Sequence, residues 1–135
     1  MSLEGGCYCG ALRYKADGDP MFKGQCHCRE CQYLSGGHPN VTLGMPTSEF
    51  TYVKGTPKQF RRSDFASPVT REFCGECGTH ILTRSPRLPG GVLVKVGTLD
   101  DPSVYGAPRM VIWTTEKQSF HVIPDGVPTF GRFPG

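Results

Sequence analysis

The feature of this sequence that most constrains its fold is the grouping of its seven cysteines. All of them belong to three short clusters: Cys7-x-Cys9, Cys26-x-Cys28-x-x-Cys31 and Cys74-x-x-Cys77. Thiolates at such spacings are typical ligands of zinc, which takes four of them in a closed structural site. A metal that joins two clusters brings distant segments of the chain together. The clusters therefore predict which distant segments are in contact in the fold.

The composition predicts a mainly β fold with little helix. The chain has 18 glycines and 12 prolines among 135 residues, which favours many turns over long helices. This length suits a single domain, and we expect one domain over residues 1–135. A tail with several prolines, from 116 to 135, should be ordered by wrapping around the body. The expected strands lie at 11–16, 21–25, 41–43, 49–53, 59–62, 70–73, 79–83, 92–96 and 109–114, with one or two helical turns at 28–34.

Charge and hydropathy exclude several classes of function. The net charge of +3 is small and the basic residues are dispersed, which argues against binding of nucleic acid. The apolar runs are too short to cross a membrane, and the first six residues lack both regions of a signal peptide. We therefore expect a cytoplasmic protein whose cysteines stay reduced, as thiols or as metal thiolates.

The glycines that follow two of the clusters indicate how the cysteines divide. Gly10 follows Cys9 and Gly78 follows Cys77, and a glycine there lets the backbone turn so that amides approach the thiolates. We therefore expect one structural zinc site, held by Cys7, Cys9, Cys74 and Cys77. Structural zinc in small peptides contributes roughly 10–16 kcal/mol, as much as the whole net stability of a domain at about 5–15 kcal/mol. Loss of this site should therefore unfold the protein.

The remaining three cysteines predict a second zinc site with a different role. Cys26, Cys28 and Cys31 leave the fourth ligand to water or substrate, which is typical of a catalytic zinc. Zinc with three thiolate ligands is soft and prefers a further sulfur, so a small thiol is the expected exogenous ligand. Such a thiol would be deprotonated, and a thiolate attacks small aldehydes at neutral pH.

Other interpretations of the cysteines stay open. A disulfide network fits an odd number of thiols badly, and a redox role for either Cys-x-x-Cys spacing is disfavoured by the neighbouring cysteines. The stronger competitor is a second structural zinc, with His27, His38 or His80 as its fourth ligand. We expect His38 to line a pocket, His27 and His80 to lie at the surface or behind the ligands, and His121 to be structural.

Three motifs in order carry a family resemblance: Gly6-Cys7-Tyr8-Cys9-Gly10, Cys26-His27-Cys28-Arg29-Glu30-Cys31 and Arg71-Glu72-Phe73-Cys74-Gly75-Glu76-Cys77-Gly78. Later stretches agree with it, namely Gly97-Thr98-Leu99-Asp100-Asp101-Pro102, Ile112-Trp113 and Pro124-Asp125-Gly126-Val127-Pro128. In these motifs the chain resembles the glutathione-dependent formaldehyde-activating enzyme family, also called the centromere protein V family. The resemblance covers nearly the whole chain.

The resemblance implies a zinc-bound fold of antiparallel sheets in a tent-like arrangement, shared with a Rab accessory protein. It implies the same division of ligands, with a structural zinc on Cys7, Cys9, Cys74 and Cys77 and a catalytic zinc on Cys26, Cys28 and Cys31. The activity for which the family is named joins glutathione and formaldehyde into S-hydroxymethylglutathione. That activity is classed among the carbon–sulfur lyases.

Our first hypothesis is therefore a zinc-dependent carbon–sulfur lyase-like enzyme that acts on the adduct of a small thiol, such as glutathione, and a small aldehyde. Arg29, beside the central motif, would attract a carboxylate of such a thiol. The alternative is a zinc-stabilised protein-binding module, which should have a closed second site or no second site, and an exposed apolar patch. A nucleic-acid-binding zinc ribbon ranks last, because no basic run is interleaved with aromatic residues.

Overall fold

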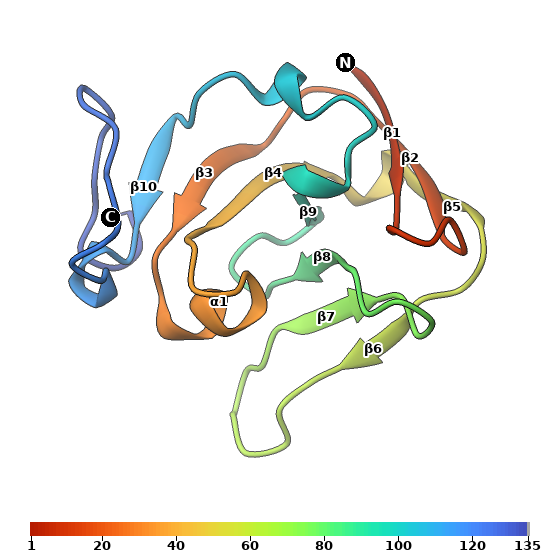
Figure 1. The fold of residues 1–135 in the computed structure, drawn as a ribbon, viewed down its shortest axis with the longest axis horizontal. Coiled ribbons are helices and arrows are strands. Elements are labelled where there is room, and N and C mark those ends of the chain that lie inside the picture. Colours follow the sequence, from red (N-terminus) through yellow and green to blue (C-terminus); the bar gives the residue numbers. More distant parts are fainter. Residues whose placement is uncertain (135) are drawn as a thin grey trace.

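The computed structural model describes residues 1–134, whose strands form two β-sheets. Gly135, the last residue of the expected domain, lies outside the described residues. The smaller sheet is antiparallel and has the order β1-β2-β5, formed by β1 (Ser2–Gly6), β2 (Arg13–Asp17) and β5 (Phe50–Lys54). The larger sheet has seven strands in the order β10-β3-β4-β9-β8-β7-β6 (Figure 1).

The larger sheet carries most of the strands in the described residues. In chain order these are β3 (Phe22–Cys26), β4 (Asn40–Pro46), β6 (Lys58–Phe60), β7 (Thr70–Phe73), β8 (His80–Arg84), β9 (Gly91–Lys95) and β10 (Met110–Ile112). One short helix, α1 (Arg29–Leu34), joins β3 to β4. Single 3₁₀ turns lie at Thr47–Glu49, Val96–Thr98, Pro102–Tyr105 and Thr114–Glu116. The expected mainly β fold with little helix is confirmed.

The expected strands all occur, with ends that differ by a few residues, and the helical turns expected at 28–34 form α1. Sequence patterning does not predict β1, a short strand in which only Leu3 and Gly5 are buried. One pairing also departs from the expected antiparallel arrangement, because β10 runs parallel to β3, with Ile112 opposite Cys26. A parallel neighbour requires a crossover, and the long connection from β9 to β10 provides it.

The core lies where the two sheets face each other. Tyr14 of β2 is wholly buried, and its hydroxyl lies 2.8 Å from Oγ1 of Thr98. Gly5 permits this contact, because a Cβ atom there would lie 2.3 Å from the Thr98 carbonyl oxygen and 2.5 Å from the Tyr14 hydroxyl. The main apolar cluster takes residues from both sheets: Leu3, Leu12, Tyr14 and Ala16 from the first hairpin, and Leu43, Met45, Ile81, Leu82, Val92 and Val94 from the larger sheet.

The tail is ordered against the body, as its composition predicts, and it returns along β10. Val111 donates its N–H to the Pro128 carbonyl at 3.0 Å, and Phe130 donates back to the Val111 carbonyl at 2.9 Å. Trp113 donates to the Arg132 carbonyl at 3.1 Å, so the contact continues to the end of the described chain. In Figure 1 this segment lies outside β10, at the edge of the larger sheet. None of the helices in residues 1–134 combines the length and the apolar character needed to cross a membrane.

Candidate metal centres and the adjoining cavity

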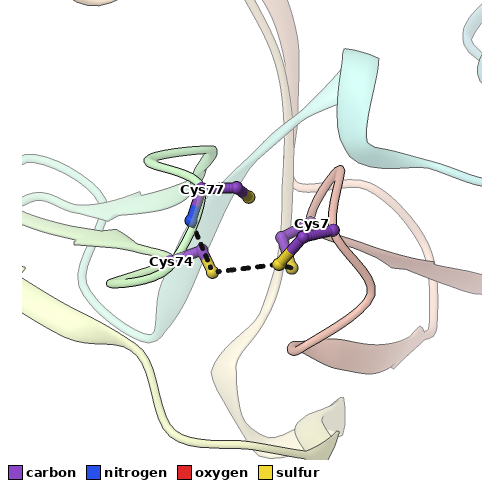
Figure 2. A group of neighbouring side chains, drawn as sticks. Cys7, Cys74 and Cys77 are labelled. Carbon is purple, nitrogen blue, oxygen red and sulfur yellow. Dashed lines mark hydrogen bonds between the residues drawn. The ribbon is translucent and has the colours of Figure 1, made fainter.

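The four-cysteine cluster, Cys7, Cys9, Cys74 and Cys77, joins two turns that are far apart in the sequence. The first pair lies between β1 and β2 and the second between β7 and β8, and Figure 2 shows the two turns facing each other. All four sulfur atoms lie within 4.8 Å of one another. The distance is 3.7 Å from Cys7 to Cys9 and 3.8 Å from Cys9 to Cys74. Tetrahedral zinc with Zn–S bonds of about 2.3 Å separates its sulfurs by about 3.8 Å, so the cluster fits this ion.

Glycines with positive φ form both turns, as the sequence predicts. Gly10 has a φ of 82° and Gly78 a φ of 78°, and each donates its N–H to the carbonyl of the first cysteine of its pair. The amides that reach sulfur belong to other residues: Leu12 donates to Cys7 Sγ at 3.1 Å, and Cys77 to Cys74 Sγ at 3.5 Å. These donors stabilise thiolates, which are the form that binds zinc.

Thr79 links the two turns. Its Oγ1 accepts the Tyr8 N–H at 3.1 Å and lies 3.1 Å from Cys77 Sγ. The hydrogen bonds from the Thr79 side chain and backbone lower the pKa of the Cys77 thiol to about 6. One ligand of this cluster is therefore largely a thiolate at neutral pH before any metal binds.

The three-cysteine cluster, Cys26, Cys28 and Cys31, comes from one continuous segment. Cys26 ends β3, and Cys28 is the N-cap of α1, where its sulfur accepts the Cys31 N–H at 3.4 Å. The three sulfurs lie within 4.8 Å of one another, and those of Cys28 and Cys31 are 3.2 Å apart. Asn40, at the start of β4, places its Nδ2 atom 3.6 Å from Cys31 Sγ.

Protons are shared unevenly within this cluster. Hydrogen bonds from Cys26 and Cys28 lower the pKa of Cys31 to about 3, and the positive charge of Lys95 adds to the effect. The hydrogen bonds of Cys26 with Cys28 and Cys31 raise the pKa of Cys26 instead. The cluster therefore holds one thiolate readily, and a metal that displaces the remaining protons would complete the set.

No histidine, aspartate or glutamate within residues 1–134 adds a ligand atom to either cluster. His80 instead packs against Phe73, with ring centroids 5.7 Å apart. His27, which lies between two of the cysteines, turns its ring to His121, with the two Nδ1 atoms 3.1 Å apart. A second site closed by a histidine of this chain is therefore not formed. The sulfur atoms themselves form no disulfide, since all seven cysteines are free.

His27 and His121 form a buried pair behind the three-cysteine cluster. The Gln118 N–H donates to His121 Nδ1 at 2.9 Å, and His121 Nε2 donates to the Gly37 carbonyl at 2.6 Å. This pattern makes His121 Nδ1 an acceptor and His27 Nδ1 the donor to it. His121 is structural, as expected, whereas His27 is wholly buried and reaches no surface.

The expectation that His38 lines a pocket is wrong. Its side chain is exposed, and Nδ1 lies 2.8 Å from the carbonyl of the next residue, Pro39. Gly36 and Gly37 both have positive φ, so the loop turns sharply before β4 begins. Asn40, two residues later, lines the cavity instead and lies beside Cys31.

A cavity of about 530 Å³ adjoins the three-cysteine cluster, within the range of small-molecule sites. Its wall includes all three cysteines and Asn40. Most of the remaining wall is apolar and comes from the larger sheet, the loops before β7 and β9, the residue after β10 and the tail: Phe22, Val69, Leu88, Leu93, Met110, Ile112, Trp113, Phe133 and Pro134. The cysteines therefore share one cavity with a largely apolar wall.

Charged residues occupy the polar part of the wall: Arg29, Glu30, Arg71, Arg87 and Glu116. Arg29 is among them, but it is exposed and its Nη1 donates to Gln32 Oε1 at 2.5 Å. Arg71 of β7 is different, because only 9% of it is exposed. Sequence reasoning missed Arg71, although a cation in the middle of a strand leading into Cys74 was a usable signal.

A second buried cation lies near the cysteines. Lys95 ends β9, is 8% exposed, and donates from Nζ to Thr83 Oγ1 at 3.1 Å. Burial lowers the pKa of its ammonium group to about 8, against the opposing effect of the thiolate at Cys31. The three-cysteine cluster thus lies in a region where buried positive charge can balance thiolates.

Trp113 of the cavity wall adopts a strained backbone. Its φ is 59°, the only positive value of a non-glycine residue within residues 1–134. Such a conformation costs of order 1–3 kcal/mol and is held here by the N–H bond to Arg132 and by edge-to-face packing on Phe133 at 5.3 Å. Strain of this kind tends to be kept at functional sites.

Comparison with known proteins agrees with this geometry. No curated protein matches the chain. Among solved structures, the fold is similar to a crystal structure of a Rhodobacter sphaeroides protein, a structural-genomics target, with a TM-score of 0.63 and 19% identity over 78% of this chain and 97% of that one. The model of the glutathione-dependent formaldehyde-activating enzyme family matches residues 2–116, which include both cysteine clusters. By this match over most of its length, the chain belongs to that family.

Proposed function

We propose that this protein is a zinc-dependent carbon–sulfur lyase-like enzyme, similar to S-hydroxymethylglutathione synthase, that makes or cleaves the adduct of a small thiol and a small aldehyde. The observation that carries the proposal is the three-cysteine cluster, which has no fourth protein ligand within residues 1–134 and adjoins a cavity of about 530 Å³. Family membership supports glutathione as the thiol and formaldehyde as the aldehyde.

In this proposal the two clusters have separate roles. Cys7, Cys9, Cys74 and Cys77 would hold a structural zinc, and Cys26, Cys28 and Cys31 would hold a catalytic one. A zinc ion with three protein ligands accepts one exogenous ligand and lowers the pKa of a thiol bound there. The sulfur spacing of both clusters and the thiolate character of Cys31 support this assignment.

The reaction needs little from the chain beyond binding and orientation. In the forward direction the thiol loses its proton to water, the thiolate sulfur forms a bond to the carbonyl carbon, and the carbonyl oxygen takes up a proton. In the reverse direction the same carbon–sulfur bond breaks. Asn40, by donating to Cys31 Sγ, holds that ligand in place, while the apolar wall formed by Phe22, Leu93 and Ile112 limits the approach of water.

We also propose that residues 1–135 act as one domain in the reducing cytoplasm. Seven free cysteines, clustered as metal ligands, suit a compartment in which thiols stay reduced. The tail supports the one-domain proposal, because it contributes Phe133 and Pro134 to the same cavity as the cysteines of β3 and α1.

The proposal is tested by measuring exchange between free glutathione and its formaldehyde adduct by NMR, with the zinc-loaded protein and without it. The uncatalysed exchange is already fast, so the expected result is an added rate proportional to protein concentration. The Cys28→Ser variant serves as the matched control and should add no rate. An exchange rate that stays at the uncatalysed value at every protein concentration would favour the alternative, a non-catalytic zinc-stabilised binding module.

A further inference from the structure

Arg71 is a buried cation whose pairing within the described residues is weak. Its Nη2 lies 3.2 Å from Oε1 of Glu30, and its Nη1 lies 3.5 Å from Oγ1 of Thr83. Both distances are long for hydrogen bonds of a guanidinium group, and neither contact is bidentate. A guanidinium group has five N–H donors, so most of the binding capacity of Arg71 is not used by these two contacts.

The partner of Arg71 is a replaceable one. Glu30 belongs to α1 and its side chain is 48% exposed, whereas that of Arg71 is 10% exposed. An exposed carboxylate regains its hydration when it leaves such a pair. A buried guanidinium group that is left without an anion, in contrast, keeps a large desolvation penalty that nothing compensates. A second carboxylate that enters the cavity can therefore displace Glu30 at little cost.

The position of this ion pair relates it to the cysteines. Glu30 lies between Cys28 and Cys31 in the sequence and shares the cavity wall with them and with Arg71. Arg87, a second cation on the wall, stacks on Phe133 at 3.9 Å and has no carboxylate within 4.0 Å in residues 1–134. Besides Arg29, the wall thus places two further arginines, one buried and one without an ion pair, in the cavity that the cysteine sulfurs also line.

We infer that Arg71 forms a carboxylate-binding subsite, so that the thiol taken by this cavity is an acidic one whose carboxylate exchanges with Glu30. The inference rests on the proposed function for the choice of a thiol, but the subsite itself is defined by Arg71 and Glu30. It assigns to Arg71, and not to the exposed Arg29, the recognition of the substrate carboxylate. Bidentate pairing with a carboxylate is the geometry for which arginine is suited.

The test measures binding without chemistry. S-methylglutathione has no free thiol and cannot form the adduct, and its dimethyl ester has the same shape without carboxylate charge. Calorimetric titration of the zinc-loaded protein should show that the acid binds more tightly than the ester by about 10- to 100-fold, the value of hydrogen bonds to a charged group. Equal affinity for acid and ester, or no binding of either, would overturn the inference.

Two variants with opposite expected effects locate the subsite. Arg71→Gln should weaken binding of the acid by about 10- to 100-fold and leave the ester unchanged. Glu30→Gln removes the competing carboxylate and should tighten binding of the acid by up to about 5-fold, again without effect on the ester. Arg109→Gln, an exposed arginine outside the cavity, is the matched control and should change neither. If Arg71→Gln does not fold, unchanged acid affinity in Glu30→Gln is sufficient to reject the subsite.

Binding and exchange together separate the two proposals. Acid-selective binding that depends on Arg71, without any added exchange rate, would retain the subsite and reject the proposed reaction. Added exchange with equal binding of acid and ester would retain the reaction and reject the subsite.

Discussion

The two cysteine clusters use the same ligand chemistry, but their cysteines differ greatly in how far apart they lie in the sequence. The four-cysteine cluster joins the turn after β1 to the turn after β7, and Cys74 lies 65 positions after Cys9. The three-cysteine cluster lies within a single stretch, from the end of β3 to the first turn of α1. The first must assemble with the tertiary fold, whereas the second needs only one local segment to be correctly placed.

The difference indicates what each metal would do. A ligand set that spans distant segments makes metal binding and folding one process. A ligand set from one segment beside a cavity leaves folding to the sheets and makes the metal available to an exogenous ligand. The surroundings agree: the four-cysteine cluster is supported by amides and by Thr79, while the three-cysteine cluster is surrounded by buried cations and a cavity wall.

The largest expected effect is at Cys74. Cys74→Ser removes one ligand of the four-cysteine cluster at a residue that is 1% exposed. The free energy of structural zinc binding, roughly 10–16 kcal/mol, exceeds the net free energy of unfolding of many domains. The variant should therefore show no cooperative unfolding transition. Thermal unfolding followed by circular dichroism measures this, with zinc content per chain determined in parallel. A variant that still unfolds cooperatively would show that the sheets fold without this metal.

Cys28→Ser should give the opposite result. Serine is a good N-cap, so α1 should keep its start, and the unfolding temperature should stay within a few degrees of the native value. Zinc content should fall from two ions to one, and the added glutathione exchange rate should disappear. A large loss of stability would mean that both clusters hold the fold, and the contrast between them would not stand.

A smaller effect is expected behind the three-cysteine cluster. His121→Ala removes the acceptor of His27 Nδ1 and leaves a buried donor unpaired, which costs about 1–3 kcal/mol. The free energy of unfolding in urea measures this cost. If the pair also positions the cysteine segment, a competing chelator should remove the zinc of the three-cysteine cluster faster than in the native protein, with the other zinc unaffected. If this zinc is removed at the same rate from the variant and from the native protein, the pair has only a packing role.

The smallest effect is expected at the ion pair of Arg13 with Asp100, near the four-cysteine cluster. The Arg13 side chain is 36% exposed and that of Asp100 is 51% exposed, so solvent screens the pair and Asp100→Asn should cost less than about 1 kcal/mol. The hydrogen bond from Arg13 lowers the pKa of Asp100, so the pair contributes fully above the ordinary carboxyl value of 3.8 and is lost only as the pH falls through the lowered value. Urea unfolding at neutral pH and two salt concentrations measures it, and the difference should shrink at high salt.

The sequence was sufficient to predict what depends on local backbone chemistry. Gly10 and Gly78 identified the two similar turns, because the positive φ after the second cysteine favours glycine at that position. The short helix after Cys28 was also predictable, since no glycine follows Cys31 and Gly36 lies beyond its end. Alternation of polar and apolar residues then located most strands, though not the short β1.

Features that depend on tertiary packing were not predictable in this way. Arg71 and Lys95 reach the region of the cysteines only because β7, β8 and β9 are neighbours in the sheet. The buried pairing of His27 with His121 requires the tail to return along β10, which no local pattern specifies. His38 was misplaced for a related reason, because its loop turns outward at two glycines before Asn40 reaches the cavity.

The residues that line the cavity come from several separate stretches of the sequence, one of which is the tail. The family match ends at residue 116, yet Phe133 and Pro134 lie on the cavity wall, and Phe133 stacks on Arg87. The cysteines and this part of the wall are therefore encoded by separate stretches of the gene. Mutations in the last twenty or so codons can alter the wall of the cavity while the sulfur atoms stay in place.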